Sequence, residues 1–281
     1  AFSCGVETII PTTGLYRNGI STITPLGVNG LPGCVGFRLP HTQMRIVELD
    51  ADGGASGRDV APGEPGMVLF KSPNVFSGFL NAADTAKAFT PDGWLITGDI
   101  GYLDRDERLN LSGRAKDLII RSGHNIDPKT IEDAIGAHPA VQLAAAVGAP
   151  DAYAGELPVV FATLRPGAQV SEAELLAFTA ERVDEAPAKP KHVYLIEQMP
   201  VTNVGKIYKP ELRAQAAGHT ARELIAALCQ ALPPDQRPRV ASTEASGVAV
   251  HLPPGAPAAL ADQLHAALAP LPVKTRVIVG A

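Results

Sequence analysis

Apolar residues in the first part of the chain come in short runs separated by turn-forming residues. Runs at 44–49, 67–70 and 94–96 each have the length of a strand, and clusters rich in Gly, Pro and Asp lie between them. Two further apolar runs flank the polar stretch 104–108, a pattern typical of a β-hairpin. Together these runs predict a β-rich, barrel-like unit that ends near Ser112.

Beyond this unit, helical and strand periodicities alternate. An Asp-Pro pair at 127–128 can cap and begin a helix, because apolar residues then recur on one helical face. Ser171 followed three residues later by Glu174 is the signature of a capping box, and it predicts a helix at 172–183. Strands are expected at 118–120, 141–147, 159–164 and 192–196. These elements predict a small α+β domain over residues 113–217.

The remaining residues, 218–281, show two more helical and two more strand patterns. Helices are expected at 221–232 and 258–268, and strands at 248–252 and 273–279. No cluster of catalytic residue types accompanies them. The sequence therefore predicts an α+β protein in three parts, the last an α/β extension of unknown role.

The composition is that of an ordinary globular protein. Hydrophobic residues make up 46% of the 281 residues and charged residues 19%. No apolar run reaches the ~18 residues of a membrane span, so we expect no transmembrane segment. The formal net charge of −5 argues against a broad nucleic-acid-binding surface.

Cysteine usage and the first residues bear on where the protein works. Cys4, Cys34 and Cys229 are widely spaced and fit neither a disulfide framework nor a metal site, so a reducing, cytoplasmic location is expected. The first residues include no initiator methionine and no signal-peptide pattern, which is typical of an internal cut in a longer protein.

Two segments place polar residues where chemistry could use them. Segment 93–99 reads as a strand that runs into a Gly-Asp turn, where the Asp99 carboxylate could accept hydrogen bonds from two vicinal hydroxyls. Segment 113–128 places Arg114 and two further basic residues before a glycine that lets the backbone approach a ligand closely. Taken singly, the first is more often a plain turn, and the second is as often a solvated hairpin. His124, in the second segment, is more often a backbone-bonded loop residue than a base or a metal ligand.

A third segment, 200–207, places Lys206 directly after a glycine on a loop that follows a predicted strand. A flexible ammonium there can reach a phosphoryl oxygen, although a Gly-Lys pair in a turn is usually an exposed lysine. The spacing is not that of a P-loop.

The three segments in this order resemble the closing motifs of the acyl-CoA synthetase branch of adenylate-forming enzymes. That family has Thr-Gly-Asp, then Gly-Arg-x-Lys-Asp-x-Ile running into Gly-x-Asn-Ile-x-Pro, then Pro-x-Thr-x-x-Gly-Lys-Ile, and all three stand here. The resemblance covers about residues 30–213, and the chain departs from it at 128–132, where Pro-Lys-Thr-Ile-Glu replaces Pro-x-Glu-x-Glu.

The resemblance implies a role for each matching residue. Asp99 would bind the ribose hydroxyls of ATP, Arg114 would contact the ribose or phosphates, and Lys206 would be the catalytic lysine of adenylation. Lys116 would be the hinge of a mobile lid. The remaining set, which would line the path of CoA, is Ser122, Gly123 and His124.

The resemblance also implies the domains and the reaction. Residues 1–112 would be the β-barrel-like end of a large amino-terminal domain, and 113–217 the α+β lid. The enzyme would activate a carboxylic acid, taken to be a fatty acid, as acyl-AMP and transfer it to CoA, with release of pyrophosphate and AMP.

The parts of such an enzyme that this chain lacks should lie upstream. No residue here is assigned to a metal: the Mg²⁺ ligands are expected at or before the start of the chain, and the Glu7-Thr8 pair stands in reverse order. The missing amino-terminal part of the same protein would be its partner, and the fragment alone should be inactive.

Two alternatives remain open. The chain could come from an adenylation domain that loads a carrier protein, since the lid motifs are shared. It could also be a non-catalytic nucleotide-binding module.

Overall fold

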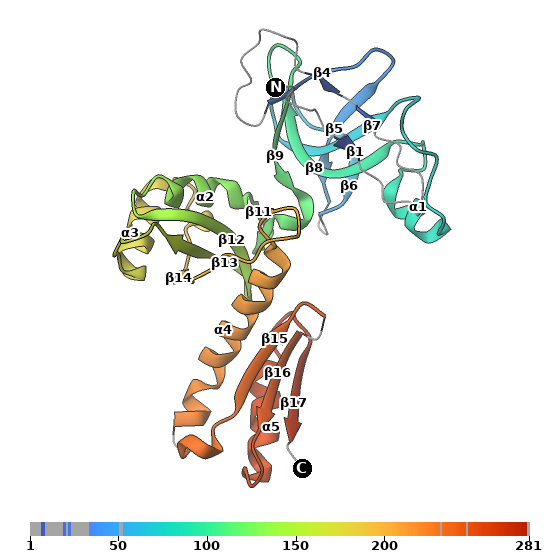
Figure 1. Cartoon of the computed structure of the whole chain (residues 1–281). Helices are drawn as coiled ribbons and strands as arrows, with labels where there is room; N and C mark the ends of the chain where they lie inside the picture. Colours follow the sequence, from blue (N-terminus) through green and yellow to red (C-terminus); the bar gives the residue numbers. More distant parts are fainter. Residues whose placement is uncertain are drawn as a thin grey trace. The chain divides into compact units, whose positions relative to one another are not determined.

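The computed structural model describes residues 7–8, 19–20, 22–23, 34–50, 53–230, 232–245 and 247–279. Cys4 and the first residues of the domain predicted at 1–112 lie outside this set. The chain divides into two compact units, residues 1–116 and 117–281 (Figure 1). The boundary expected near Ser112 lies within a strand, β9 (Leu109–Arg114). No helix among the described residues is both long and apolar enough to span a membrane.

The first unit is built on an antiparallel sheet of seven strands. Their order is β3 (Thr22–Ile23), β4 (Cys34–Arg38), β9, β8 (Leu95–Leu103), β7 (Gly66–Lys71), β5 (Gln43–Leu49) and β6 (Ala55–Asp59). Among the described residues β3 and β6 are free edges, so the sheet is open and the expected barrel does not close. The predicted hairpin around 104–108 is confirmed, because Leu103 pairs with Leu109.

Smaller elements complete the first unit. A two-stranded sheet joins β1 (Glu7–Thr8) to β2 (Gly19–Ile20), and a short helix, α1 (Ala82–Ala88), is capped by Asn81. The core lies on the sheet, where β7 is buried over five consecutive residues and Phe70 packs with Ile46 and Leu109.

The second unit begins with a five-stranded mixed sheet. Four strands lie in the order β11 (His124–Ile126), β10 (Ile119–Arg121), β13 (Gly155–Leu164) and β12 (Val141–Asp151), and β14 (His192–Leu195) pairs in parallel with β13. Two helices, α2 (Pro128–Gly136) and α3 (Glu172–Arg182), pack on this sheet. The predicted caps are confirmed, since Asp127 and Ser171 accept the backbone N–H groups of Lys129 and Glu174.

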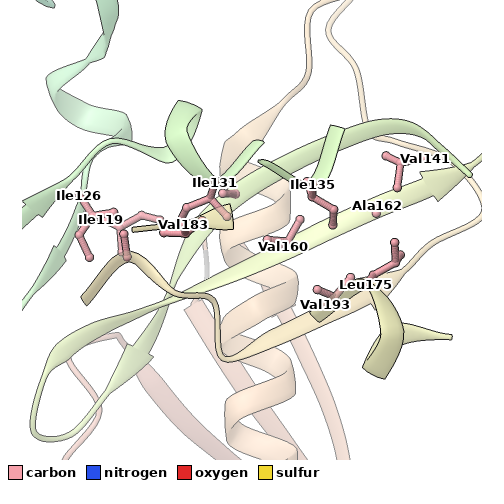
Figure 2. Close-up of a cluster of buried hydrophobic side chains, with 12 residues drawn as sticks. Ile119, Ile126, Ile131, Ile135, Val141, Val160, Ala162, Leu175, Val183 and Val193 are labelled. Carbon is pink, nitrogen blue, oxygen red and sulfur yellow. The ribbon is translucent and has the colours of Figure 1, made fainter. Parts of the chain in front are cut away.

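Alternating side chains of this sheet serve two separate cores. On one face, Val160 and Ala146 contact the apolar side chains of α2 and α3, as Figure 2 shows for Ile131, Ile135 and Leu175. On the other face, the neighbouring Phe161 packs with residues of α4 (Lys209–Gln230). The strand period of two therefore gives the sheet a helix layer on each side.

Helix α4 crosses the boundary expected between residues 217 and 218 and continues into residues 218–281, the extension. There, β15 (Arg239–Thr243) pairs antiparallel with β16 (Gly247–Leu252), and β16 pairs in parallel with β17 (Thr275–Val279) after the crossover helix α5 (Ala258–Leu268). Apolar residues of α4, α5 and β16 form one core. The helix expected at 221–232 is thus the second half of α4, and the predicted α+β class is confirmed.

Candidate functional site

Asp99 lies within β8, beside an irregularity that the sequence Thr-Gly-Asp explains. Residues 97–99 face only Val68 of β7, because the flanking register pairs are Ile96 with Leu69 and Ile100 with Met67. The Thr97 hydroxyl donates to the Val68 carbonyl at 2.8 Å and accepts the Asp99 N–H at 3.0 Å. Gly98 adopts φ of +75°, which glycine tolerates best.

The expectation that the strand ends at Asp99 is wrong, since β8 continues to Leu103. The reason is that Thr97 replaces the lost ladder bonds locally, so the strand bulges and then resumes. The bulge fixes the backbone from which the carboxylate projects.

Arg114 stands directly opposite Asp99 on the neighbouring strand. Their backbones are register partners, and the Arg114 Nε lies 3.0 Å from Asp99 Oδ1. The Asp99 side chain is only 11% exposed whereas that of Arg114 is 55% exposed. Burial raises the pKa of Asp99, and the nearby guanidinium only partly opposes this. The pair offers a recessed acceptor, suited to hydroxyl donors, beside an accessible cation.

Lys116 lies in the short 3₁₀ turn Ala115–Asp117 that follows β9. The division between the two compact units falls directly after it. On the other side of the division, Asp117 accepts from Arg213 of α4 at 2.8 Å. A residue between two compact units is placed where a hinge has to be, so Lys116 stays a prediction as the hinge.

Ser122, Gly123 and His124 belong to one tight hairpin. Ser122 and Gly123 connect β10 to β11, and both have positive φ, 50° and 83°, as a two-residue type I′ turn requires. Arg121 anchors the hairpin by donating to the Pro187 carbonyl at 2.6 Å. All three turn residues are exposed. No described atom lies within 4 Å of where a Cβ on Gly123 would stand, so the turn's conformation, not crowding, selects glycine.

Lys206 is carried by a second tight hairpin, at 200–208. Val201 pairs with Ile207, and the Thr202 N–H donates to the Lys206 carbonyl at 2.7 Å. Gly205 takes φ of +78°. The Thr202 hydroxyl accepts the Lys206 N–H at 3.2 Å. The hydrogen bonds of Thr202 and the turn conformation of Gly205 therefore fix the backbone of this hairpin. The exposed side chain of Lys206 projects from it.

Glu132 and Lys209 form a contact that the motif reading missed. The Lys209 Nζ lies 2.8 Å from Glu132 Oε1, which also accepts the Ala146 N–H at 2.9 Å. The side chain of Lys209 is only 18% exposed, and that of Glu132 is only 24% exposed. This glutamate is the second of the family's Pro-x-Glu-x-Glu pattern, and it ties the start of α4 to α2 and β12. Glu132 and Lys209 are too far apart in the sequence for a local pattern to predict their contact.

The structure brings some predicted residues together. Asp99 and Arg114 form one pair in the first unit, and Lys206 and the Ser122-Gly123-His124 turn occupy separate hairpins of the second. Within the described part of the chain, His, Cys, Asp and Glu nowhere gather in a group that could hold a metal ion. The structure therefore assigns no Mg²⁺ ligands among these residues.

Residues 130–206 match the family described as AMP-binding enzyme C-terminal domain. This stretch of the chain is therefore similar to the carboxyl-terminal domain of AMP-binding enzymes. The match begins in α2 and ends at Lys206, so the matched residues contain three strands of the five-stranded sheet, β12, β13 and β14, and most of the lysine hairpin.

Similar proteins extend the match beyond that domain. The chain is 44% identical over 196 residues to marinolic acid–CoA ligase of Pseudoalteromonas sp. (strain SANK 73390), covering 70% of this chain and 30% of that protein. It is 37% identical over 182 residues to a long-chain-fatty-acid–CoA ligase of Bacillus subtilis (strain 168), covering 64% of this chain and 31% of that protein.

A solved structure gives the same result. ATP-bound MatB from Rhodopseudomonas palustris is similar with a TM-score of 0.65 and 32% identity, over 70% of this chain and 38% of that one. The resemblance read from the motifs is confirmed: the chain is related to acyl-CoA ligases. It spans about a third of the length of the curated relatives it matches.

Proposed function

We propose that this chain is the carboxyl-terminal part of an ATP-dependent acid–thiol ligase. The complete enzyme, meaning this chain with the remaining length that its relatives have, activates a carboxylic acid as acyl-AMP and transfers the acyl group to CoA. The observation that carries the proposal is the buried Asp99 carboxylate paired with Arg114, in a chain 44% identical to an acid–CoA ligase. A fatty acid is the proposed substrate class, and the chain alone is proposed to be inactive.

The first step proposed is adenylation. The acid's carboxylate oxygen attacks the α-phosphorus of ATP, a P–O bond forms, and pyrophosphate leaves with its electron pair. Negative charge accumulates on the phosphoryl oxygens, and the Lys206 ammonium stabilises that charge. Asp99 accepts hydrogen bonds from the ribose hydroxyls and Arg114 contacts the ribose or phosphates, so they hold the nucleotide while the bond changes.

The second step proposed is thioester formation. The CoA thiol attacks the acyl carbon, an S–C bond forms, the thiol proton is lost to solvent, and AMP leaves. The reaction takes place at the acyl carbon and not at phosphorus, and the electron pair of the broken acyl C–O bond stays on the phosphate oxygen of AMP, so Lys206 is proposed not to be required there. Rotation about Lys116 would replace the Lys206 hairpin with the Ser122-Gly123-His124 turn, which lines the path of the pantetheine arm.

The proposal is tested with the complete enzyme and a panel of carboxylic acids, by ATP–pyrophosphate exchange and by thioester formation. Exchange that depends on a fatty acid, followed by thioester formation with CoA, supports it. Thioester formation only on a carrier protein would favour the carrier-loading alternative. Nucleotide binding without exchange for any acid would leave a non-catalytic nucleotide-binding module. This chain alone should give no exchange.

A further inference from the structure

The extension touches the hairpin that carries Lys206. Tyr208, two residues after Lys206, donates its hydroxyl hydrogen bond to Glu244 Oε2 at 2.5 Å. Glu244 lies in the turn that follows β15, so it belongs to the extension and not to the lid. The hydrogen bond raises the pKa of the Tyr208 phenol.

The extension is held in place for this contact by the close approach of β15 to α4. A Cβ at Gly218 of α4 would lie 2.5 Å from the Ser242 hydroxyl oxygen and 3.3 Å from the Ser242 Cβ, so β15 lies close to the helix at this residue and a side chain there would require Ser242 to move. Ala217 and Ala221, on the same helix, pack in the core of the extension with Val248 of β16. The turn bearing Glu244 begins two residues beyond Ser242.

Tyr208 is in turn part of the framework of the lysine hairpin. Its N–H donates to the Pro200 carbonyl at 2.8 Å and closes the base of the hairpin. Its carbonyl accepts the Glu211 N–H at 3.3 Å in the first turn of α4. Restraining the Tyr208 side chain therefore restrains the backbone two residues from Lys206.

We propose that Glu244 is a positioning residue for Lys206, acting through Tyr208, so that the extension sets the geometry of the adenylation lysine. This inference rests on the role given to Lys206 in the proposed function. The extension would then contribute to adenylation, although it holds no cluster of catalytic residue types. Tyr208→Phe and Glu244→Ala each remove the same hydrogen bond, the one between Tyr208 and Glu244.

The direct test measures amide hydrogen exchange in this chain. Glu244→Ala and Tyr208→Phe should each speed exchange at the amides of Gly205, Lys206 and Tyr208 by about 3- to 10-fold. The double variant should add nothing further. Asp262→Asn, which removes an exposed carboxylate on α5, is the matched control and should leave these amides within about 1.5-fold.

A second arm uses the complete enzyme. Glu244→Ala should slow adenylation by about 3- to 10-fold and leave transfer from supplied acyl-adenylate to CoA unchanged. Glu244→Gln should recover much of the rate, because its amide oxygen still accepts the Tyr208 hydroxyl. Unchanged exchange at the three hairpin amides, or equal slowing of both steps, would overturn the inference. If the wild-type enzyme makes no acyl-adenylate, the proposed function fails, and the exchange arm still decides whether Glu244 orders the hairpin.

Discussion

Breaking the Glu132–Lys209 pair should destabilise the second unit without touching the first. Lys209→Met removes the ammonium and keeps most of the apolar stem. At 2.8 Å the pair's Coulomb energy is roughly 6 kcal/mol for an effective dielectric constant of about 20. Desolvation of both groups offsets much of this. Because the side chains are only 18% and 24% exposed, we expect a net loss of about 2–3 kcal/mol in the free energy of unfolding.

The same chain offers a matched control. Lys129 pairs with Asp133 at 2.6 Å, but those side chains are 49% and 66% exposed. Lys129→Met should therefore cost no more than about 0.5 kcal/mol. Urea unfolding followed by far-UV circular dichroism reports both units, whereas fluorescence of Trp94, the single tryptophan, reports the first unit. Equal losses in the two variants, or a shift of the Trp94 transition with Lys209→Met, would refute the reasoning.

Three further predictions concern the hairpin turn, the hinge and the buried carboxylate. Gly123→Leu in the complete enzyme should abolish most thioester formation and leave pyrophosphate exchange largely intact. Gly123→Ala has the same φ strain and less bulk, so it should retain more thioester formation. Lys116→Pro should slow one half-reaction far more than the other, measured by exchange and by transfer from acyl-adenylate, and equal slowing would count against the hinge. Burial raises the pKa of Asp99 above its usual 3.8, so its proton-linked contribution to stability is complete below that pH and is lost as pH rises through the raised pKa. Asp99→Asn should remove this pH dependence from the Trp94 unfolding transition, and an unchanged slope would contradict it.

Helices with a clear periodic pattern or capping signature could be predicted from the sequence. The helix expected at 258–268 is α5 at the same bounds, because its apolar residues recur on one helical face. Ser171 accepts the Glu174 N–H as a capping box predicts. Two short elements had no such signal: α1 buries no residue, and β15 has Val240 as its one large apolar side chain.

The length of α4 could not be read from the sequence. The sequence predicts a boundary between residues 217 and 218, and it predicts a helix only from 221. In the structure Gly218 lies inside α4, and the helix continues beyond it because Ala217, Ala221 and Ile225 pack in the core of the extension. Tertiary packing thus carries the helix through a residue of low helix propensity.

The candidate site shows the same division between local and tertiary information. The motifs predicted Asp99, Arg114 and Lys206 as site residues, but not the contacts that hold each of them. The Thr97 hydroxyl in the β8 bulge and the contact of Tyr208 with Glu244 depend on backbone and side-chain partners brought together by folding. The partner of Glu132 lies 77 positions along the chain, and spacing alone gives no reason to choose Lys209.

The role of Lys206 is the central claim, and Lys206→Ala in the complete enzyme tests it most directly. Losing a positioned donor to developing phosphoryl charge should reduce pyrophosphate exchange by on the order of 100- to 1,000-fold. Transfer of a supplied acyl-adenylate to CoA should stay within roughly a few-fold of normal. Lys189→Ala, which removes an exposed lysine of the same unit, should affect neither step. Equal damage to both steps in a Lys206→Ala protein shown to be folded would contradict the assignment of Lys206 to adenylation.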